Sequence, residues 1–195
     1  SACRGALNDA ARGAAFSLLA RTQKRNLLAA DIRMRLFDSQ VRAIATYGCE
    51  AWGPDMIVDA LNGGPQGNRG HDRNNLAEGL FEAALKDETV KLQTNFMRQC
   101  TGAARPANRL LYAELGRLPL QYHVFKMLIG FYNRIRKQKH TYCYRALTEE
   151  LVEAVDAKSR PQGQPADCSL SWGQLFLGII EHFADVWKGM PDTTR

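Results

Sequence analysis

Residues 31–53 read DIRMRLFDSQVRAIATYGCEAWG, and their pattern decides the fold class. Apolar or small residues recur every three or four positions, which is the repeat of one face of an α-helix. This stripe consists of Met34, Phe37, Val41, Ile44, Gly48, Ala51 and Trp52. The opposite side carries Arg35, Ser39, Arg42 and Thr46. The stretch therefore predicts one long amphipathic helix around which the other helices pack.

Two residue types in this stretch predict further details. Gly53-Pro54 should end the helix, because proline lacks the amide hydrogen and restricts the residue before it. Gly48 lies inside the apolar stripe, where a glycine costs about 1 kcal/mol relative to alanine. We therefore expect another element to pack against the bare backbone at Gly48.

The rest of the chain also has helical spacing, and no stretch shows the strong alternation of a strand. Gly102 is expected to cap a helix in the left-handed conformation, and Ser169 or Ser171 to cap the last one. The further helical stretches are residues 6–20, 76–100, 108–115, 119–137, 142–157 and 172–187. The expected fold is all-α, an irregular bundle of about seven or eight helices.

Two stretches rich in helix-breaking residues organise the chain. Residues 62–75 are dominated by Gly, Asn and Pro and predict a flexible loop. Residues 158–168 contain two prolines and a glycine and predict a linker. We expect a helical module over residues 1–140 and a C-terminal helical extension over residues 141–195.

Composition narrows the possible functions. The 195 residues carry 26 Lys and Arg against 20 Asp and Glu, a net charge of +6. A basic chain favours acidic partners, nucleic acid first, although a merely solvated basic surface is the alternative. The sequence predicts no membrane span, since no run of eighteen apolar residues occurs. It predicts no signal peptide either, because charged residues interrupt the start of the chain.

The cysteines indicate the compartment. The five cysteines are an odd number and widely spaced, which argues against a disulfide framework. A reducing, intracellular setting is therefore expected, either nuclear or cytoplasmic.

Two motifs resemble a known family. The first comprises LFD at residues 36–38, Val41 and YGCEAWG at residues 47–53; the second comprises FMR at 96–98 and LYAELGRLPL at 111–120. In this order they resemble the region after the polymerase core in non-LTR (LINE-type) retrotransposon reverse transcriptases, over residues 6–135. The resemblance implies that residues 1–140 form a thumb-like module beside an upstream polymerase domain. It also implies a helix along the minor groove of an RNA–DNA or DNA duplex.

Catalytic and metal-binding patterns are missing from the sequence. Polymerase chemistry needs paired carboxylates that hold two metal ions, and no adjacent aspartate pair occurs. Glu149 and Glu150 are neighbours on a predicted helix, where successive side chains diverge by about 100°. They are therefore a poor substitute for a pair of carboxylates that holds metal ions. His140 and Cys143 have no second pair to complete a zinc site. We expect no catalytic residue, no metal and no cofactor, and no polymerase activity from this chain alone.

Two groups of cations are the candidate nucleic-acid contacts, with phosphate contact as their expected role. They are Arg33, Arg35 and Arg42 in the first group, and Arg134, Arg136, Lys137 and Lys139 in the second. Three tyrosines near the second group could stack on bases, or lie half-buried in the core. Two alternatives stay open: a protein-binding helical module that uses the apolar residues between Trp172 and Trp187, and an inactive element remnant. The oligomeric state is open as well.

Overall fold

The computed structural model describes residues 2–24, 29–62, 81, 84–102, 106–159 and 171–188. All regular structure in these ranges is helical, so the all-α prediction is confirmed. The helices are α1 (Ala2–Lys24), α2 (Ala30–Leu36), α3 (Arg42–Ala45), α4 (Cys49–Asn62), α6 (Glu88–Thr101), α7 (Asn108–Glu114), α8 (Leu120–Lys137), α9 (Tyr142–Ser159) and α10 (Trp172–Lys188), with a π-helical segment η1 (Phe37–Val41). Because α2, η1 and α3 are continuous, the described ranges contain eight helices, within the predicted number.

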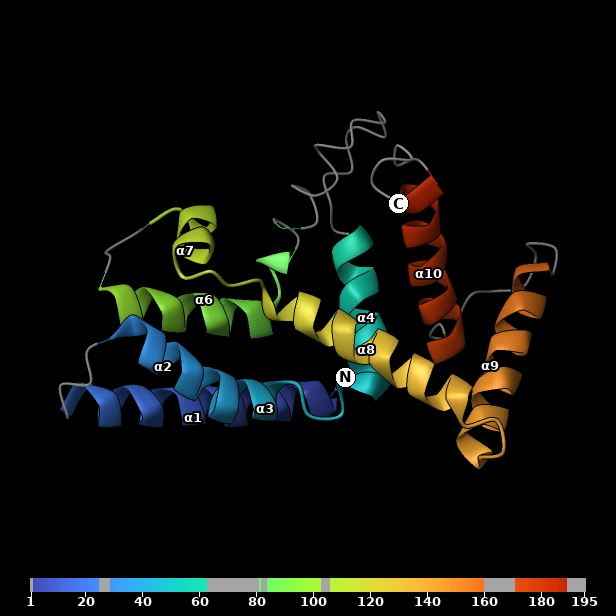
Figure 1. Ribbon diagram of the computed structural model, residues 1–195, viewed down its shortest axis with the longest axis horizontal. Coiled ribbons are helices and arrows are strands. Elements are labelled where there is room, and N and C mark those ends of the chain that lie inside the picture. The colour runs from blue at the N-terminus through green and yellow to red at the C-terminus, as the bar shows by residue number, and fades with distance from the viewer. Residues whose placement is uncertain are drawn as a thin grey trace.

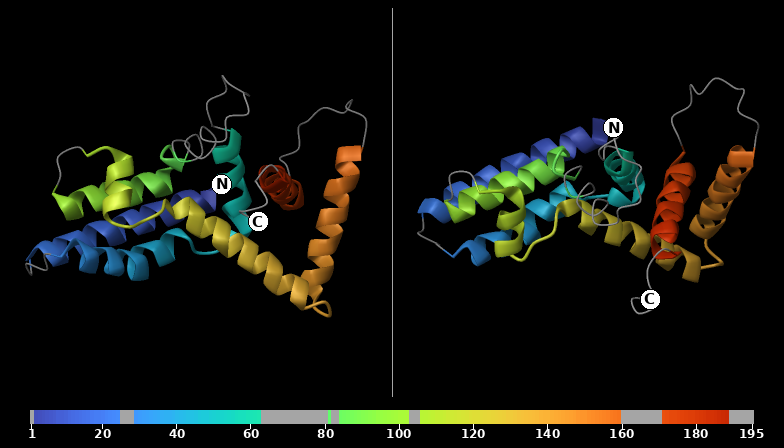
Figure 2. Two further views of the ribbon diagram at one scale, coloured as in Figure 1. Left: turned by 45° about the horizontal axis from the view of Figure 1, so that its top comes forward. Right: turned by 90° about the horizontal axis from the view of Figure 1, so that it is seen from above.

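Helix α8 connects two groups of helices (Figure 1). One group consists of α1, the continuous helix α2–α3, α6 and α7, which lie side by side. The other consists of α4, α9 and α10: α10 packs against both of its neighbours, and α9 turns back from the end of α8 (Figure 2). Since α8 packs against both α6 and α4, it holds the two groups together.

The predicted apolar stripe forms the centre of the core as far as Ala45. Met34, Phe37 and Val41 are at most 1% exposed. The ring centroids of Phe37 and Phe96 on α6 are 4.7 Å apart. The same cluster of buried side chains continues into α8, so one apolar interior underlies both groups of helices.

The prediction of one unbroken helix over residues 31–53 is wrong. The helix ends at Ala45, a turn follows over residues 46–48, and α4 begins at Cys49. Gly48 occupies the left-handed region at φ 62°, where an L side chain would be strained. A Cβ atom at Gly48 would meet nothing within 4 Å, so the expected packing partner is missing and this glycine serves the turn.

The glycine that accommodates a close neighbour is Gly53. A Cβ atom added there would lie only 2.9 Å from Cγ1 of Val124 on α8. The absence of a side chain at Gly53 therefore allows α4 to cross α8 closely, and α4 and α8 share the most extensive contact between helices in the described chain.

The prediction that Pro54 ends a helix is also wrong, because Pro54 lies inside α4. In a regular helix the amide of residue 54 would donate to the carbonyl of Glu50, and proline has no amide hydrogen. The indole Nε1 of Trp172 on α10 donates to that Glu50 carbonyl at 2.8 Å. A donor from a distant helix thus satisfies the acceptor that proline leaves without its usual partner.

The caps predicted at Gly102 and Ser171 are confirmed. Gly102 ends α6 in the left-handed conformation at φ 65°. Ser171 caps α10: its Oγ accepts from the amide of Gln174 at 3.3 Å, and Gln174 Oε1 accepts from the amide of Ser171 at 2.9 Å. This is a reciprocal capping box. Beyond Asn62, the predicted loop at 62–75 lies outside the described residues, and most of the predicted linker does too.

Candidate functional site

Helix α8 lies in the longest stretch of the sequence that has no acidic residue. No Asp or Glu occurs between Leu115 and Thr148, a segment that contains all of α8, the turn after it and the start of α9. The cations of this segment are Arg117, Lys126, Arg134, Arg136, Lys137, Lys139 and Arg145. Such a segment creates a positive potential that no acidic neighbour in sequence offsets.

The second predicted group of cations lies together at one end of α8. Arg134, Arg136 and Lys137 occupy its last turn, and Lys139 lies in the turn that follows. All four side chains are exposed, and none forms an ion pair with another described residue. Positive charges near the C-terminal end of a helix stabilise it by interacting with the helix dipole. These cations therefore have a structural role, and phosphate binding would be a second one.

The cations of the first predicted group, Arg33, Arg35 and Arg42, differ from one another in their exposure and in their partners. Arg33 is 7% exposed and faces Cys100 on α6. Burial raises the pKa of the Cys100 thiol to about 11, although the nearby Arg33 guanidinium acts in the opposite direction. Arg35 is well exposed and forms an ion pair with Asp31 at 3.0 Å. Arg33 therefore presents little surface to an external phosphate, whereas Arg35 remains accessible.

Arg42 belongs to a cluster that joins the two sequence motifs. Asp38 accepts from Arg42 at 3.1 Å and also binds Arg117. Asp38 comes from the first motif and Arg117 from the second. Because one carboxylate faces two guanidinium groups, the cluster retains a net positive charge beside α8. The Asp38–Arg117 pair spans 79 residues, and no spacing rule predicts it.

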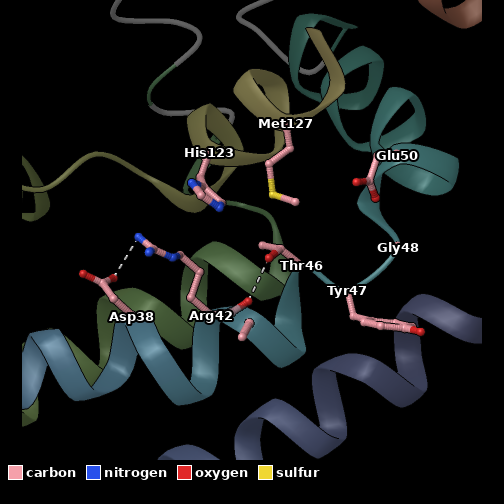
Figure 3. A pocket seen from close by; sticks show the side chains of 9 residues that line it. Asp38, Arg42, Thr46, Tyr47, Gly48, Glu50, His123 and Met127 are labelled. Atoms are coloured by element: carbon pink, nitrogen blue, oxygen red, sulfur yellow. Dashed lines mark hydrogen bonds and ion pairs between the residues drawn. The ribbon is translucent and has the colours of Figure 1, made fainter. Parts of the chain in front are cut away.

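An open pocket of about 610 Å³ lies between this cluster and α8 (Figure 3). Its lining includes Arg42, Tyr47 and Glu50 on one side, and His123 and Met127 from α8 on the other. Burial, then the charge of Arg42, lowers the pKa of His123 below its ordinary value of 6.5, which favours the neutral imidazole.

The neighbouring thiol is not an activated nucleophile. Cys49 Sγ lies 3.7 Å from Met127 Sδ, and the Cys49 side chain is fully buried. Burial, then the charge of Glu50, raises the pKa of this thiol to about 12. Since a thiolate is the reactive form of cysteine, this thiol is inert at neutral pH.

The two predicted groups of cations do not form a single cluster. Arg42 lies beside His123, near the start of α8, whereas the second group lies at its far end. At 1.5 Å per residue, the thirteen residues from His123 to Arg136 span about 20 Å. The intervening surface includes the exposed Lys126, which is not among the predicted nucleic-acid contacts. The absence of acidic residues from 115 to 148 is the signal that could have found it.

The described ranges contain neither a candidate membrane span nor a candidate metal site. No helix there is both long and apolar enough to traverse a lipid bilayer. No set of three or more His, Cys, Asp or Glu side chains in the same ranges is arranged to hold a metal ion. In comparisons with known proteins, no family model, no curated protein and no solved structure matches this chain.

Proposed function

We propose that this chain is a non-catalytic helical fragment of a retrotransposon reverse transcriptase that binds the phosphate backbone of the template–primer duplex. The observation that carries the proposal is the exposed cationic end of α8, formed by Arg134, Arg136, Lys137 and Lys139, in a segment without acidic residues. Cations in this arrangement bind phosphates independently of sequence and release counterions as they do so.

The family assignment within the proposal rests on the two ordered motifs. Both lie in the body formed by α2–α3, α4, α6, α7 and the start of α8. The ion pair between Asp38 and Arg117 links one motif to the other, as expected for parts of one functional unit. The upstream polymerase domain would supply the catalytic carboxylates and would be the natural neighbour of this module.

A binding experiment across a salt series tests the proposal. Fluorescence anisotropy would follow binding to a labelled RNA–DNA hybrid and to a DNA duplex. We expect log K to fall linearly with log salt, by about 0.9 for each phosphate neutralised on B-form DNA. Replacing Arg134, Arg136, Lys137 and Lys139 by Gln should weaken binding and reduce this slope.

A matched variant controls for net charge. Four exposed cations elsewhere are changed to Gln: Arg12, Arg21, Lys86 and Lys91. This variant carries the same net charge as the α8 variant, and we expect it to retain most of the affinity and the slope. Absence of binding by the unmodified chain at low salt would overturn the proposal, as would equal losses in the two variants.

Protein binding through α10 has less support. Phe176 and Ile179 are at most 1% exposed, and Trp172 both stacks on Phe176 and bonds to α4. Trp172, Phe176 and Ile179 of α10 are therefore used within the chain, whereas Ile180 is 36% exposed. Light scattering after size exclusion would reveal a stable oligomer if this alternative were correct.

A further inference from the structure

Helix α9 lies at the edge of the molecule, with one side on the helical body and the other directed away from it (Figure 1, Figure 2). Its inner side packs on α10. Glu150 Oε1 accepts from the amide of Gly173 at 3.3 Å, and a Cβ atom at Gly173 would lie 2.6 Å from the carbonyl oxygen of Glu150. Ala154 is 1% exposed, and Leu151 packs against the core. These residues fix which side of α9 is directed away from the body.

The outer side of α9 has the spacing of a coiled-coil seam. We call its residues the α9 seam: Tyr142, Arg145, Glu149, Val152 and Asp156. They follow one another by three and four positions in turn, which is the repeat at which one helix packs along another. All five are exposed, Tyr142 by 87% and Val152 by 54%. None of the three charged side chains forms an ion pair with another described residue, so the seam is available to a partner.

The charges along the seam are complementary to those of a second α9 that runs in the opposite direction. In an antiparallel pair with a two-fold axis between positions 150 and 151, position 145 faces position 156, and position 149 faces position 152. Arg145 then meets Asp156 of the second copy, and by symmetry this pair forms twice. The methylene groups of Glu149 cover Val152 of the second copy, while the carboxylate stays in solvent.

Other arrangements lack this complementarity. In a parallel pair in register, each seam residue faces its own copy, so Arg145, Glu149 and Asp156 would all meet like charges. A partner helix of uniform charge would match only one end of the seam, because the cation precedes both carboxylates. The pattern of charge therefore fits a second copy of this chain in the antiparallel orientation.

We propose that the α9 seam is a self-association surface through which two copies of this chain form an antiparallel, two-fold symmetric dimer. The rise from Tyr142 to Asp156 is about 21 Å, so the surface is small and the dissociation constant should lie in the micromolar to millimolar range. The inference does not depend on the proposed function, because none of the cations at the end of α8 belongs to the seam.

Charge reversals followed by sedimentation velocity test the inference. The weight-average sedimentation coefficient of the unmodified chain should rise with concentration towards the value of a dimer. Arg145→Asp and Asp156→Arg each replace two attractive pairs by two repulsive ones, so each should weaken the dimer by at least about tenfold. An equimolar mixture of the two variants should associate again, because the charges are opposite across a mixed pair. This recovery would separate the loss of an interface from damage to the fold.

The matched control is Arg12→Asp on α1. Arg12 is exposed, and its reversal changes the net charge of the chain by the same amount as Arg145→Asp. The control should leave the dissociation constant unchanged. A chain that remains monomeric at every concentration up to about 1 mM would overturn the inference. So would a dimer that persists in both single variants, which would form through another surface, and so would a mixture that fails to associate.

Discussion

The start of α8 depends on a single buried amide, and replacing it should destabilise the chain strongly. Gln93 on α6 is 3% exposed. Its Nε2 donates to the carbonyl of Leu118 at 3.1 Å, and its Oε1 accepts from the amide of Leu120 at 2.9 Å and from the Tyr112 hydroxyl at 3.2 Å. The side chain therefore satisfies backbone groups on both sides of Pro119 and fixes where α8 begins.

The structure sets the magnitude for Gln93→Leu. The change leaves the Leu118 carbonyl and the Leu120 amide without this partner, whereas the Tyr112 hydroxyl keeps its hydrogen bond with Thr94 at 2.9 Å. The Leu120 amide is in a buried hydrogen bond, and an unsatisfied buried group costs about 1–3 kcal/mol. The bond to the Leu118 carbonyl is only partly buried, so its loss costs about the lower end of that range. We expect the free energy of unfolding to fall by about 3 kcal/mol, measured by urea denaturation followed by circular dichroism.

The variant Gln93→Glu adds a dependence on pH. A protonated glutamic acid can replace both the donor and the acceptor, but an ionised one places a buried charge against the Leu118 carbonyl. The folded-state pKa should therefore lie above the unfolded value of about 4.3. Relative to the unmodified chain at the same pH, the variant should lose stability as the pH rises from about 4 to 7. This account would be refuted if Gln93→Leu lowered the free energy of unfolding by less than about 1 kcal/mol. It would also be refuted if Gln93→Glu lost the same amount of stability at about pH 4 as at about pH 7.

Three further outcomes are expected from unfolding measurements. Trp172→Phe removes the donor to the Glu50 carbonyl and should lower the free energy of unfolding by about 1–2 kcal/mol. In a Pro54→Ala background the loss should be smaller, because alanine at this position restores a backbone donor to that carbonyl. Equal losses in the two backgrounds would contradict this account. Gly48→Ala should cost about 1–2 kcal/mol because φ is 62°, and Gly48→Asn should cost less. The pKa of His123 in the folded chain lies below 6.5, so protonation of this side chain should not reduce the free energy of unfolding above pH 6.5. Below that pH the free energy of unfolding should fall increasingly as the pH drops. His123→Gln should make it less dependent on pH in this range.

The candidate site was only partly predictable from sequence. The cations at the end of α8 follow one another in the chain, so their proximity is a local property. The burial of Arg33 against α6 and the pairing of Asp38 with Arg117 depend on how helices pack. The close approach of α4 to α8 at Gly53 was likewise not predictable, because it depends on Val124, which is distant in the chain.

The sequence by itself determined the all-α class, the buried face from Met34 to Val41, and the caps at Gly102 and Ser171. These features depend on periodicity and on hydrogen bonds between residues a few positions apart. Only the tertiary structure decided that α4 continues through Pro54, since the donor for Glu50 comes from Trp172, 122 residues away. It likewise decided which cations face solvent, because burial depends on neighbours that are distant in the chain.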